Sequence, residues 1–232
     1  MKIGIIGALK KEIQLIQNII QKRREQNIGN YKIFIGYYKK NNIFLIKSGI
    51  GKVSSSIATT VLINLYKPDI IINVGSAGAL DTSLKIGDVI VPKALCYYDV
   101  NLSNFGYSFG QIPYFPKKFL INKKLFNFIN NLSKNFKFTF LTGLLVTGDT
   151  FIRERNMINN IQYHFSSAIA VDMEATAIAQ TCYQFNIPAI IIKSISDSAD
   201  QNATIKFKKN IFVVSLQLFN FVQLILKNII KI

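Results

Sequence analysis

Short β-branched runs alternate along the chain with longer segments in which apolar residues recur at helical spacing. This alternation is typical of a layered α/β fold. The pattern predicts strands over Lys2–Ile6, Tyr31–Tyr37, Ile43–Ser48, Ile70–Gly75, Asp88–Ala94, Thr139–Gly148 and Ala189–Ser194. It predicts helices over Lys11–Arg24, Lys52–Tyr66, Lys123–Ser133, Glu154–His164, Glu174–Phe185 and Phe207–Asn228.

The connection between the second and third predicted strands is short and polar. It reads Lys39-Lys40-Asn41-Asn42, which favours an antiparallel hairpin. This hairpin interrupts an otherwise parallel pattern, so we expect a mixed, mostly parallel sheet. No internal repeat and no linker divides the sequence, and its length suits one α/β unit. We therefore expect a single domain over residues 1–232.

One predicted strand is apolar on both faces and ends in a run of small residues. The segment from Asp69 to Val74 follows Pro68, which suits a central buried strand whose proline stays outside the ladder. It ends in Gly75-Ser76-Ala77-Gly78, where a ligand can approach the backbone. Ligands of such sheets bind at the carboxyl ends of strands, so this turn is a candidate site. We expect the long loop 99–118 to be functional or interfacial.

The formal charge of the chain is +16, which on its face suggests an anionic partner such as nucleic acid. The basic residues are 24 Lys and 4 Arg, scattered among 39 Ile and 22 Asn. Lysine, isoleucine and asparagine have A/T-rich codons, whereas arginine does not. A drift in genome composition therefore explains the positive charge. We therefore expect no nucleic-acid partner, and a non-catalytic protein that binds nucleic acid is kept as an alternative of a different class.

Few features point to secretion, membranes or metals. The N-terminus runs straight into a predicted strand, and polar residues interrupt the apolar segment from Ile211 to Ile232 at helical spacing. We read that segment as a buried or amphipathic closing helix. Cys96 and Cys182 are too isolated for a disulfide framework or a metal pair. We expect a cytoplasmic protein with no membrane partner, reduced core cysteines, no metal and no cofactor, and a structural His164.

The glycine-rich turns do not carry a nucleotide-phosphate signature. The first, Gly4-Ile5-Ile6-Gly7, lacks the third glycine of a dinucleotide fingerprint. In the second, Gly51-Lys52 is followed by Val53 instead of Ser or Thr. Hydride transfer and nucleoside triphosphate hydrolysis are therefore unsupported.

Acidic residues are scarce, and several of them follow predicted strands. Glu12 lies in the first turn of a predicted helix, Asp172 and Glu174 bracket Met173, and Asp197 follows an apolar run directly. Each has an ordinary explanation, since acids complement helix dipoles and cap helices. Their common position at carboxyl ends of strands favours an active site.

The sequence carries several segments, in order and with matching spacing, that resemble the bacterial 5′-methylthioadenosine/S-adenosylhomocysteine nucleosidases. They are residues 1–8, Lys47-Ser48-Gly49-Ile50-Gly51-Lys52-Val53, Ile71-Ile72-Asn73-Val74-Gly75-Ser76-Ala77-Gly78, Phe105-Gly106-Tyr107, Val171-Asp172-Met173-Glu174-Ala175-Thr176-Ala177-Ile178-Ala179 and Ile195-Ser196-Asp197. The resemblance implies the nucleoside phosphorylase/hydrolase fold, which is a three-layer α/β/α sandwich, and a homodimer. It also implies hydrolysis of N-ribosidic bonds with release of adenine.

The resemblance assigns roles to the acids. Asp197 is similar to the general acid that protonates the imidazole ring of adenine, and Glu12 to the carboxylate that activates water with help from Ser76. Glu174 matches the acceptor of the ribose 2′ and 3′ hydroxyls, with Met173 packing nearby. An oxocarbenium-like transition state needs such an acid and base.

The remaining implied contacts are apolar. Phe151 corresponds to the aromatic that stacks on adenine, the backbone of Ile152 to the groups that read the edge of the base, and Gly78 belongs to the binding residues at its strand end. The pocket for the 5′-substituent is implied to comprise Ile50 and Phe207, with Phe105 and Pro113 lent by the other subunit. Without the resemblance, these residues would be interpreted as plain core.

Two positions depart from the family pattern. The family usually has Arg near the catalytic water where this chain has Lys193, and Glu where it has Asp172. Lysine keeps the charge but lacks the planar fork of arginine, which predicts looser positioning of the water in a functional enzyme. A phosphorylase on the same fold is the alternative. It is disfavoured because none of the four Arg lies in a glycine-rich turn, where phosphate would need a cation.

Overall fold

The structure is a computed structural model that describes residues 1–136 and 139–229. Within these residues, eleven strands form one mixed sheet. The strands are β1 (Lys2–Gly7), β2 (Gln21–Ile28), β3 (Tyr31–Tyr38), β4 (Asn41–Lys47), β5 (Ile70–Ala79), β6 (Val89–Ile90), β7 (Ala94–Tyr97), β8 (Phe119–Leu120), β9 (Leu144–Thr147), β10 (Ala168–Asp172) and β11 (Ala189–Asp197). The α-helices are α1 (Lys10–Asn18), α2 (Lys52–Tyr66), α3 (Lys123–Phe136), α4 (Arg155–His164), α5 (Ala175–Gln184) and α6 (Ala203–Asn228).

The long strand β5 is the centre of the sheet, as the sequence predicts. It pairs in parallel with β1 and β11, and its last residues pair antiparallel with β10. Strands β3 and β4 form the expected antiparallel hairpin, and β4 continues in parallel with β1. Strands β7, β9 and β10 pair in parallel on the other side. The predicted mixed sheet is therefore confirmed.

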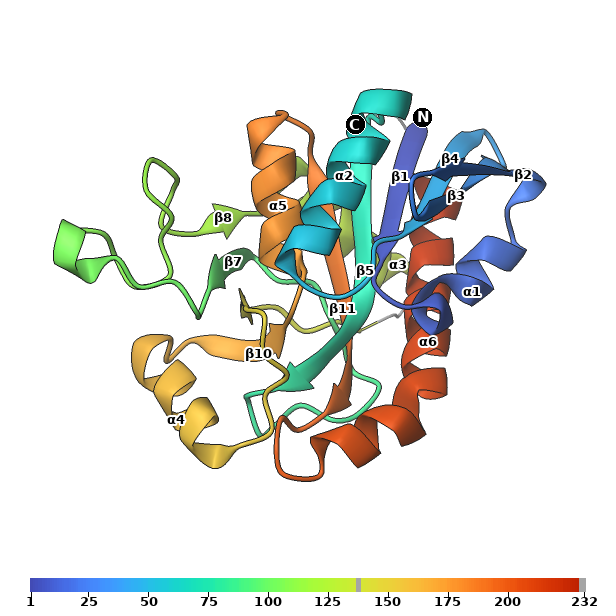
Figure 1. The fold of residues 1–232 in the computed structure, drawn as a ribbon. Helices are drawn as coiled ribbons and strands as arrows, with labels where there is room; N and C mark the ends of the chain where they lie inside the picture. The colour runs from blue at the N-terminus through green and yellow to red at the C-terminus, as the bar shows by residue number, and fades with distance from the viewer. Residues whose placement is uncertain (137–138, 230–232) are drawn as a thin grey trace.

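Helices cover both faces of the sheet (Figure 1). On one face, α2 and α5 bury Leu62 and Ile178 in a core cluster with Ile71 of β5. On the other face, α1, α3 and α6 bury apolar residues in a larger cluster with Ile72 of β5. Since neighbouring residues of a strand point to opposite faces, this explains why β5 is apolar on both. The three-layer α/β/α sandwich is confirmed.

The C-terminal helix α6 is the predicted closing helix, and it begins at Ala203 instead of Phe207. Its buried face, which includes Val214, Leu218 and Phe221, packs in the larger core cluster. Among the described helices, α6 is the one whose length and composition would suffice to cross a membrane. A single such helix is weak evidence, because buried core helices share these properties. Residues 230–232 of the predicted segment lie outside the described residues.

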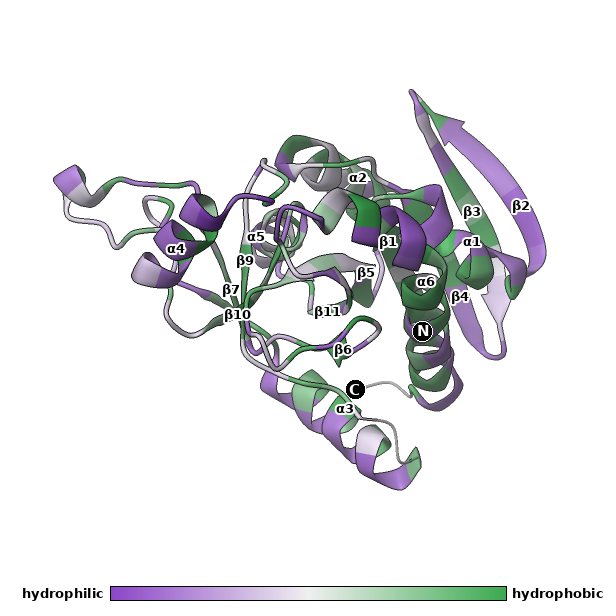
Figure 2. Ribbon diagram, turned by 90° about the horizontal axis from the view of Figure 1, so that it is seen from below, coloured by the Kyte–Doolittle hydropathy of each residue, from purple (hydrophilic) through white to green (hydrophobic). Residues whose placement is uncertain are grey.

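The helix predicted over Lys11–Arg24 is wrong in its second half. Helix α1 ends at Asn18, and residues 21–28 form β2 at the outer edge of the sheet. Nearly every side chain of β2 is exposed, so the strand has no buried face that would impose an alternating pattern. Figure 2 shows β2 as a hydrophilic ribbon beside the more apolar β3.

Other boundaries also differ from the predictions. The strand predicted over Asp88–Ala94 is two strands, β6 and β7, with Pro92 between them, because proline cannot donate to a ladder. The strand predicted over Thr139–Gly148 is reduced to β9, with one isolated bridge at Leu141. The sequence predicts neither β8 nor β10, and β11 extends to Asp197. The predicted glycine-rich turns at Gly4–Gly7 and Gly75–Gly78 are wrong, because β1 runs to Gly7 and β5 runs to Ala79.

The two cysteines predicted to be core residues are buried, whereas His164, predicted to be structural, is exposed and makes a ring contact. Cys96 and Cys182 are buried free thiols. The ring of His164 stacks on Phe109, with centroids 3.8 Å apart. Phe109 lies in the long loop 99–118, which also carries a single 3₁₀ turn at Ser103–Phe105.

Candidate active site

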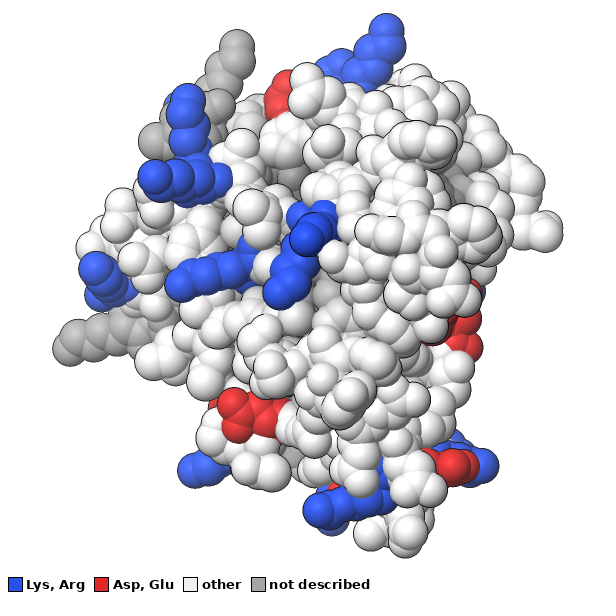
Figure 3. Space-filling view, turned by 90° about the vertical axis from the view of Figure 1, so that its left-hand side faces the viewer, with Lys and Arg blue, Asp and Glu red and all other residues white. Residues whose placement is uncertain are grey.

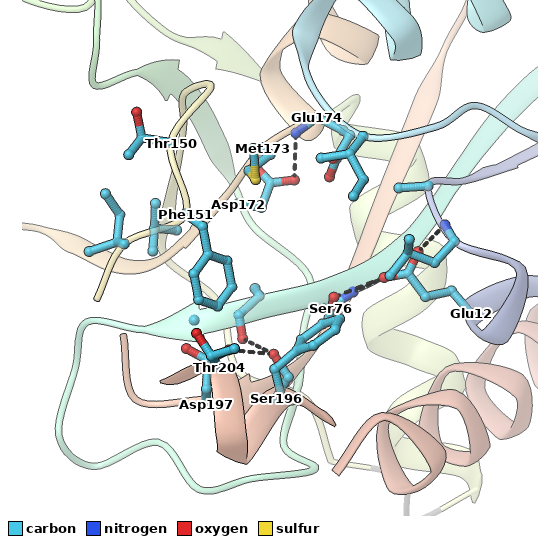
Figure 4. A pocket seen from close by; sticks show the side chains of 18 residues that line it. Glu12, Ser76, Thr150, Phe151, Asp172, Met173, Glu174, Ser196, Asp197 and Thr204 are labelled. Carbon is cyan, nitrogen blue, oxygen red and sulfur yellow. Dashed lines mark hydrogen bonds between the residues drawn. The ribbon is translucent and has the colours of Figure 1, made fainter. Parts of the chain in front are cut away.

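A cavity of about 430 Å³ opens at the carboxyl ends of the central strands. It collects eleven of the residues singled out in the sequence, from segments far apart along the chain: Glu12, Ile50, Ser76, Gly78, Phe151, Ile152, Asp172, Met173, Glu174, Asp197 and Phe207. Lys193 lies behind the cavity wall, and Phe105 and Pro113 lie outside it. Figure 4 shows Glu12, Glu174 and Asp197 on different sides of the cavity.

Glu12 is positioned by the start of α1 and by β5. Its Oε2 accepts a hydrogen bond from the backbone N–H of Leu9, 2.9 Å away, which satisfies one of the free donors of the first turn. Its Oε1 accepts from both the N–H of Ser76, at 2.9 Å, and the Ser76 hydroxyl, at 2.8 Å. The buried carboxylate is thus tied directly to Ser76 (Figure 4).

Asp197 ends β11 and faces Gly78 of β5. Its Oδ1 accepts from the N–H of Ala199 at 2.9 Å, as in an ordinary turn, and its Oδ2 accepts from the Ser196 hydroxyl at 2.7 Å. The side chain is nevertheless buried at the cavity. Burial raises the pKa of Asp197 above its usual range, and these two hydrogen bonds only partly oppose the effect. The fold therefore favours a protonated acid here.

Glu174 lies at the start of α5, directly after β10. Its Oε1 accepts from the N–H of Gly51, 3.0 Å away. Burial raises the pKa of Glu174 to about 7, the ammonium of Lys193 opposes this, and the carboxylates of Asp172 and Glu12 add to it. The hydrogen bond from Gly51 depends on a backbone φ of 94° at that residue, which is a conformation suited to glycine.

Lys193 and Asp172 form a buried ion pair beneath the cavity. The side chain of Lys193 is 1% exposed, and its Nζ lies 2.8 Å from Asp172 Oδ2 and 3.9 Å from Glu174 Oε2. Burial alone would lower the pKa of Lys193, but the surrounding carboxylates of Asp172, Glu174 and Glu12 outweigh it and raise that pKa. The lysine is therefore charged.

Two glycines of β5 make room for these groups. A Cβ on Gly75 would lie 2.9 Å from Lys193 Nζ and 3.4 Å from Glu12 Oε1. A Cβ on Gly78 would lie 3.1 Å from Asp197 Oδ1. The small residues at the end of this strand thus admit charged side chains as well as a ligand.

The remaining wall is largely apolar. The rings of Phe151 and Phe207 lie nearly perpendicular, with centroids 6.3 Å apart. Ile50, Ile152 and Met173 also line the cavity. Ser196, quoted in the sequence only within the segment that ends at Asp197, also lines the cavity. Thr150 and Thr204 line it as well and were not singled out from the sequence, although Thr150 precedes Phe151 and Thr204 lies one helical turn before Phe207.

Phe105 is 76% exposed in the long loop, and Pro113 is half-buried in the same loop. Neither contributes to the cavity of its own chain. Within one chain, they are therefore separated from Ile50 and Phe207, with which the resemblance groups them in the pocket for the 5′-substituent.

The charges of the cavity suit acid–base chemistry. Its lining residues include four acids and no Lys or Arg. Within the described residues, no cluster of His, Cys, Asp and Glu has the arrangement of a metal site. A buried acid with a raised pKa opposite a hydrogen-bonded carboxylate is the arrangement that divides two acids into proton donor and proton acceptor.

The comparisons with known proteins agree with this fold and site. A family model described as the phosphorylase superfamily matches residues 2–227. The protein is therefore a member of the phosphorylase superfamily.

Relatives within that superfamily narrow the assignment. The chain is 57% identical over 230 residues to a 5′-methylthioadenosine/S-adenosylhomocysteine nucleosidase of Buchnera aphidicola subsp. Acyrthosiphon pisum (strain Tuc7), covering 99% of each. It is similar to the Neisseria meningitidis nucleosidase of that name in complex with methylthio-immucillin-A, with TM-score 0.95, 34% identity and coverage of 98% and 99%. The chain belongs to this nucleosidase family, whose members are N-glycosyl hydrolases.

A second activity occurs on the same fold. The native futalosine hydrolase of Helicobacter pylori superposes with TM-score 0.94 at 28% identity, covering 99% of this chain and 98% of that one. The fold alone therefore does not single out one substrate.

Proposed function

We propose that this protein hydrolyses the N-ribosidic bond of 5′-methylthioadenosine and S-adenosylhomocysteine, releasing adenine and the 5′-thioribose. The observation that carries the proposal is the convergence of Glu12, Glu174 and Asp197 on one apolar-walled cavity. Membership of the nucleosidase family supports the same reaction.

Asp197 is the proposed general acid. As the bond between ribose and adenine breaks, its proton goes to the imidazole ring of adenine, and the bonding electron pair leaves with the base. Burial favours the protonated carboxyl before the reaction, and proton transfer to a leaving group stabilises the transition state. The Ser196 hydroxyl, 2.7 Å from Oδ2, then stabilises the carboxylate that remains.

Glu12 is the proposed general base. It removes a proton from the water that attacks the anomeric carbon, so that the new C–O bond replaces the broken C–N bond. Its contacts with Ser76, both below 3 Å, support this role, because the serine can orient the water and the carboxylate together.

Glu174 is proposed to accept hydrogen bonds from the ribose 2′ and 3′ hydroxyls, with Met173 packing beside the sugar. Its negative charge also stabilises the positive charge that develops on the ring. Phe151 is proposed to stack on adenine, and the backbone of Ile152 and the nearby Gly78 to line the site of the base. Their place in the cavity wall supports this arrangement.

The 5′-substituent is proposed to lie against Ile50 and Phe207. In a homodimer, Phe105 of the partner subunit and Pro113 of the partner subunit would complete this apolar surface. The high exposure of the Phe105 ring on its own chain supports the exchange. Because an apolar surface discriminates weakly by size, we also propose 5′-deoxyadenosine as a substrate.

The setting proposed for this chemistry is the cytoplasm, where the enzyme would serve methionine salvage and remove by-products of S-adenosylmethionine. We propose that the chain acts as one nucleosidase domain, without a cofactor or a nucleic-acid partner. Figure 3 shows Lys and Arg in separate groups on one face, with uncharged surface between them. On this face, the distribution favours solvated surface charge over a nucleic-acid site.

Hydrolysis is favoured over phosphorolysis by the charge of the cavity. A phosphate nucleophile would need a cation within reach, whereas the lining residues include no Lys or Arg. The nearby ammonium of Lys193 is already paired with Asp172. Glu12 would also repel the anion.

The deciding experiment measures adenine release from 5′-methylthioadenosine in phosphate-free buffer. We expect release by the parent protein and losses of about 10²-fold or more in Asp197→Asn and Glu12→Gln. Asp69→Asn, far from the cavity, is the matched control and should retain activity. Release that begins only when phosphate is added would instead establish a phosphorylase.

A further inference from the structure

We propose that Asp172 is a positioning residue that holds the ammonium of Lys193 against Glu174, and thereby fixes the carboxylate that faces the ribose hydroxyls. The inference rests on the proposed function, because it deepens the role of Glu174. It also gives Lys193 a task different from orienting water.

Asp172 has no free oxygen to offer a ligand. Its Oδ1 accepts from the Thr147 hydroxyl, which is in turn 2.8 Å from the Thr176 hydroxyl. Its Oδ2 accepts from the N–H of Ala175 at 2.8 Å and from the N–H of Glu174 at 3.3 Å. The ammonium of Lys193 is a further partner of Oδ2. Asp172 therefore acts on other protein groups, although it borders the cavity.

These contacts join three strands and a helix around one ammonium. Asp172 ends β10, Thr147 ends β9, and Ala175 begins α5. Lys193 reaches this point from β11 across Gly75 of β5, where a Cβ would meet Nζ at 2.9 Å. The ammonium is thus held by a carboxylate whose own position is fixed by backbone donors.

The two oxygens of Glu174 therefore differ in their contacts, one with a hydrogen bond and the other with a longer ion pair. Oε1 accepts from the N–H of Gly51 at 3.0 Å, and Oε2 lies 3.9 Å from Lys193 Nζ. A carboxylate that is held from both sides keeps one orientation when the cavity is empty. Such preorganisation lowers the cost of binding the sugar and of stabilising its positive charge.

The charges around Glu174 predict how Asp172 affects its ionisation. Glu174 is faced by Lys193 from β11, by Asp172 from β10, by Glu12 from α1 and by the N–H of Gly51 before α2. Asp172 raises the pKa of Glu174. An asparagine at position 172 has two opposing effects on this pKa, because it removes the charge of Asp172, which raises the pKa, and loosens the ammonium of Lys193, which lowers it. The test therefore compares substrates at one pH.

The test compares 5′-methylthioadenosine with its 2′-deoxy analogue, which lacks a hydroxyl that Glu174 is proposed to bind. We expect Asp172→Asn to lower kcat/KM about tenfold on the ribose substrate and less than about twofold on the analogue, because contacting groups couple while independent ones add.

Two further variants keep the test decisive. Thr147→Val removes the hydroxyl donor to Asp172 while keeping the side-chain shape, and should show the same selectivity for the ribose substrate with a smaller loss. Asp69→Asn is the control for charge removal outside the site. Urea unfolding of each variant identifies losses that come from unfolding.

The outcomes separate the two proposals. If the parent protein releases no adenine, the proposed function fails. If the parent is active but folded Asp172→Asn loses equally on both substrates, then Asp172 is merely structural and this inference is overturned. Should Asp172→Asn not fold, equal losses in Thr147→Val on the two substrates would overturn it instead.

Discussion

Glu174 is an acid that the fold keeps from water at the position where the proposed reaction needs a charge. Burial raises the pKa of Glu174 to about 7, against the opposing effect of Lys193. The carboxylate must be ionised to accept both ribose hydroxyls. We therefore expect kcat/KM for 5′-methylthioadenosine to rise with pH along an acidic limb centred near this pKa of about 7. A limb that stays near the ordinary glutamate pKa of 4.5 would contradict this expectation.

The same shift in the Glu174 pKa links stability to pH. Between its ordinary pKa of 4.5 and about 7, the folded protein binds more protons at Glu174 than the unfolded chain does. Its contribution to the free energy of unfolding therefore falls as pH rises through this window. In urea unfolding at about pH 5 and about pH 8, Glu174→Gln should gain stability relative to the parent at the higher pH. A constant difference would show that the pKa is not raised.

Individual acids were more predictable than their partners. Glu12, Glu174 and Asp197 stand out because few acids occur in the sequence and these follow apolar runs. No local signal placed Lys193 beside Asp172, since strand pairing brings them together. The exposure of Phe105 agrees with its implied place in the pocket of the other subunit, but no local pattern marks it among the 18 phenylalanines.

At the scale of elements, the close approach across β5 is the feature most sensitive to substitution. Gly75→Ala would push Lys193 Nζ and Glu12 Oε1 away from the strand, since its Cβ would lie 2.9 and 3.4 Å from them. We expect a loss of about tenfold or more in kcat/KM, because small displacements of reacting groups are costly.

Gly4→Ala is the matched control for overcrowding. Its Cβ on β1 would meet Ile71 Cδ1 at 2.5 Å, within the core. This variant should lose about 1–3 kcal/mol of stability while retaining activity. Equal activity losses in the two folded variants would show that crowding of the sheet, and not the site, limits turnover.

The elements with a clear pattern of apolar and polar residues were predicted well, and those without such a pattern were not. The both-sided burial of β5 and the polar hairpin before β4 followed from the sequence. Strand β10 is short, and only Met173 and Glu174 lie between it and α5, so no turn signal separates the two elements. Strand β8 has only two residues.

At the scale of the molecule, the proposed dimer can be tested by complementation. Asp197→Asn inactivates a pocket, and Phe105→Ala should weaken the pocket of its partner about tenfold through lost apolar contact. In a mixed dimer, one pocket would combine the intact Asp197 of one chain with the intact Phe105 of the other. We therefore expect activity above the sum of the separate variants after the two are unfolded and refolded together. A simple sum would mean that Phe105 does not cross between subunits.

The outermost strand, β2, bears on how this isoleucine-rich chain avoids aggregation. A sheet rich in isoleucine, in a chain with 39 such residues, invites other copies to add strands at an open edge. At this edge β2 places Lys22, Arg23 and Arg24, with a break in register and a φ of 47° at Lys22. Such charges and irregularities discourage edge-to-edge aggregation. The codon drift that enriches isoleucine in the core also supplies lysine. The same mutational pressure therefore increases the tendency to aggregate and provides part of the charge that opposes aggregation.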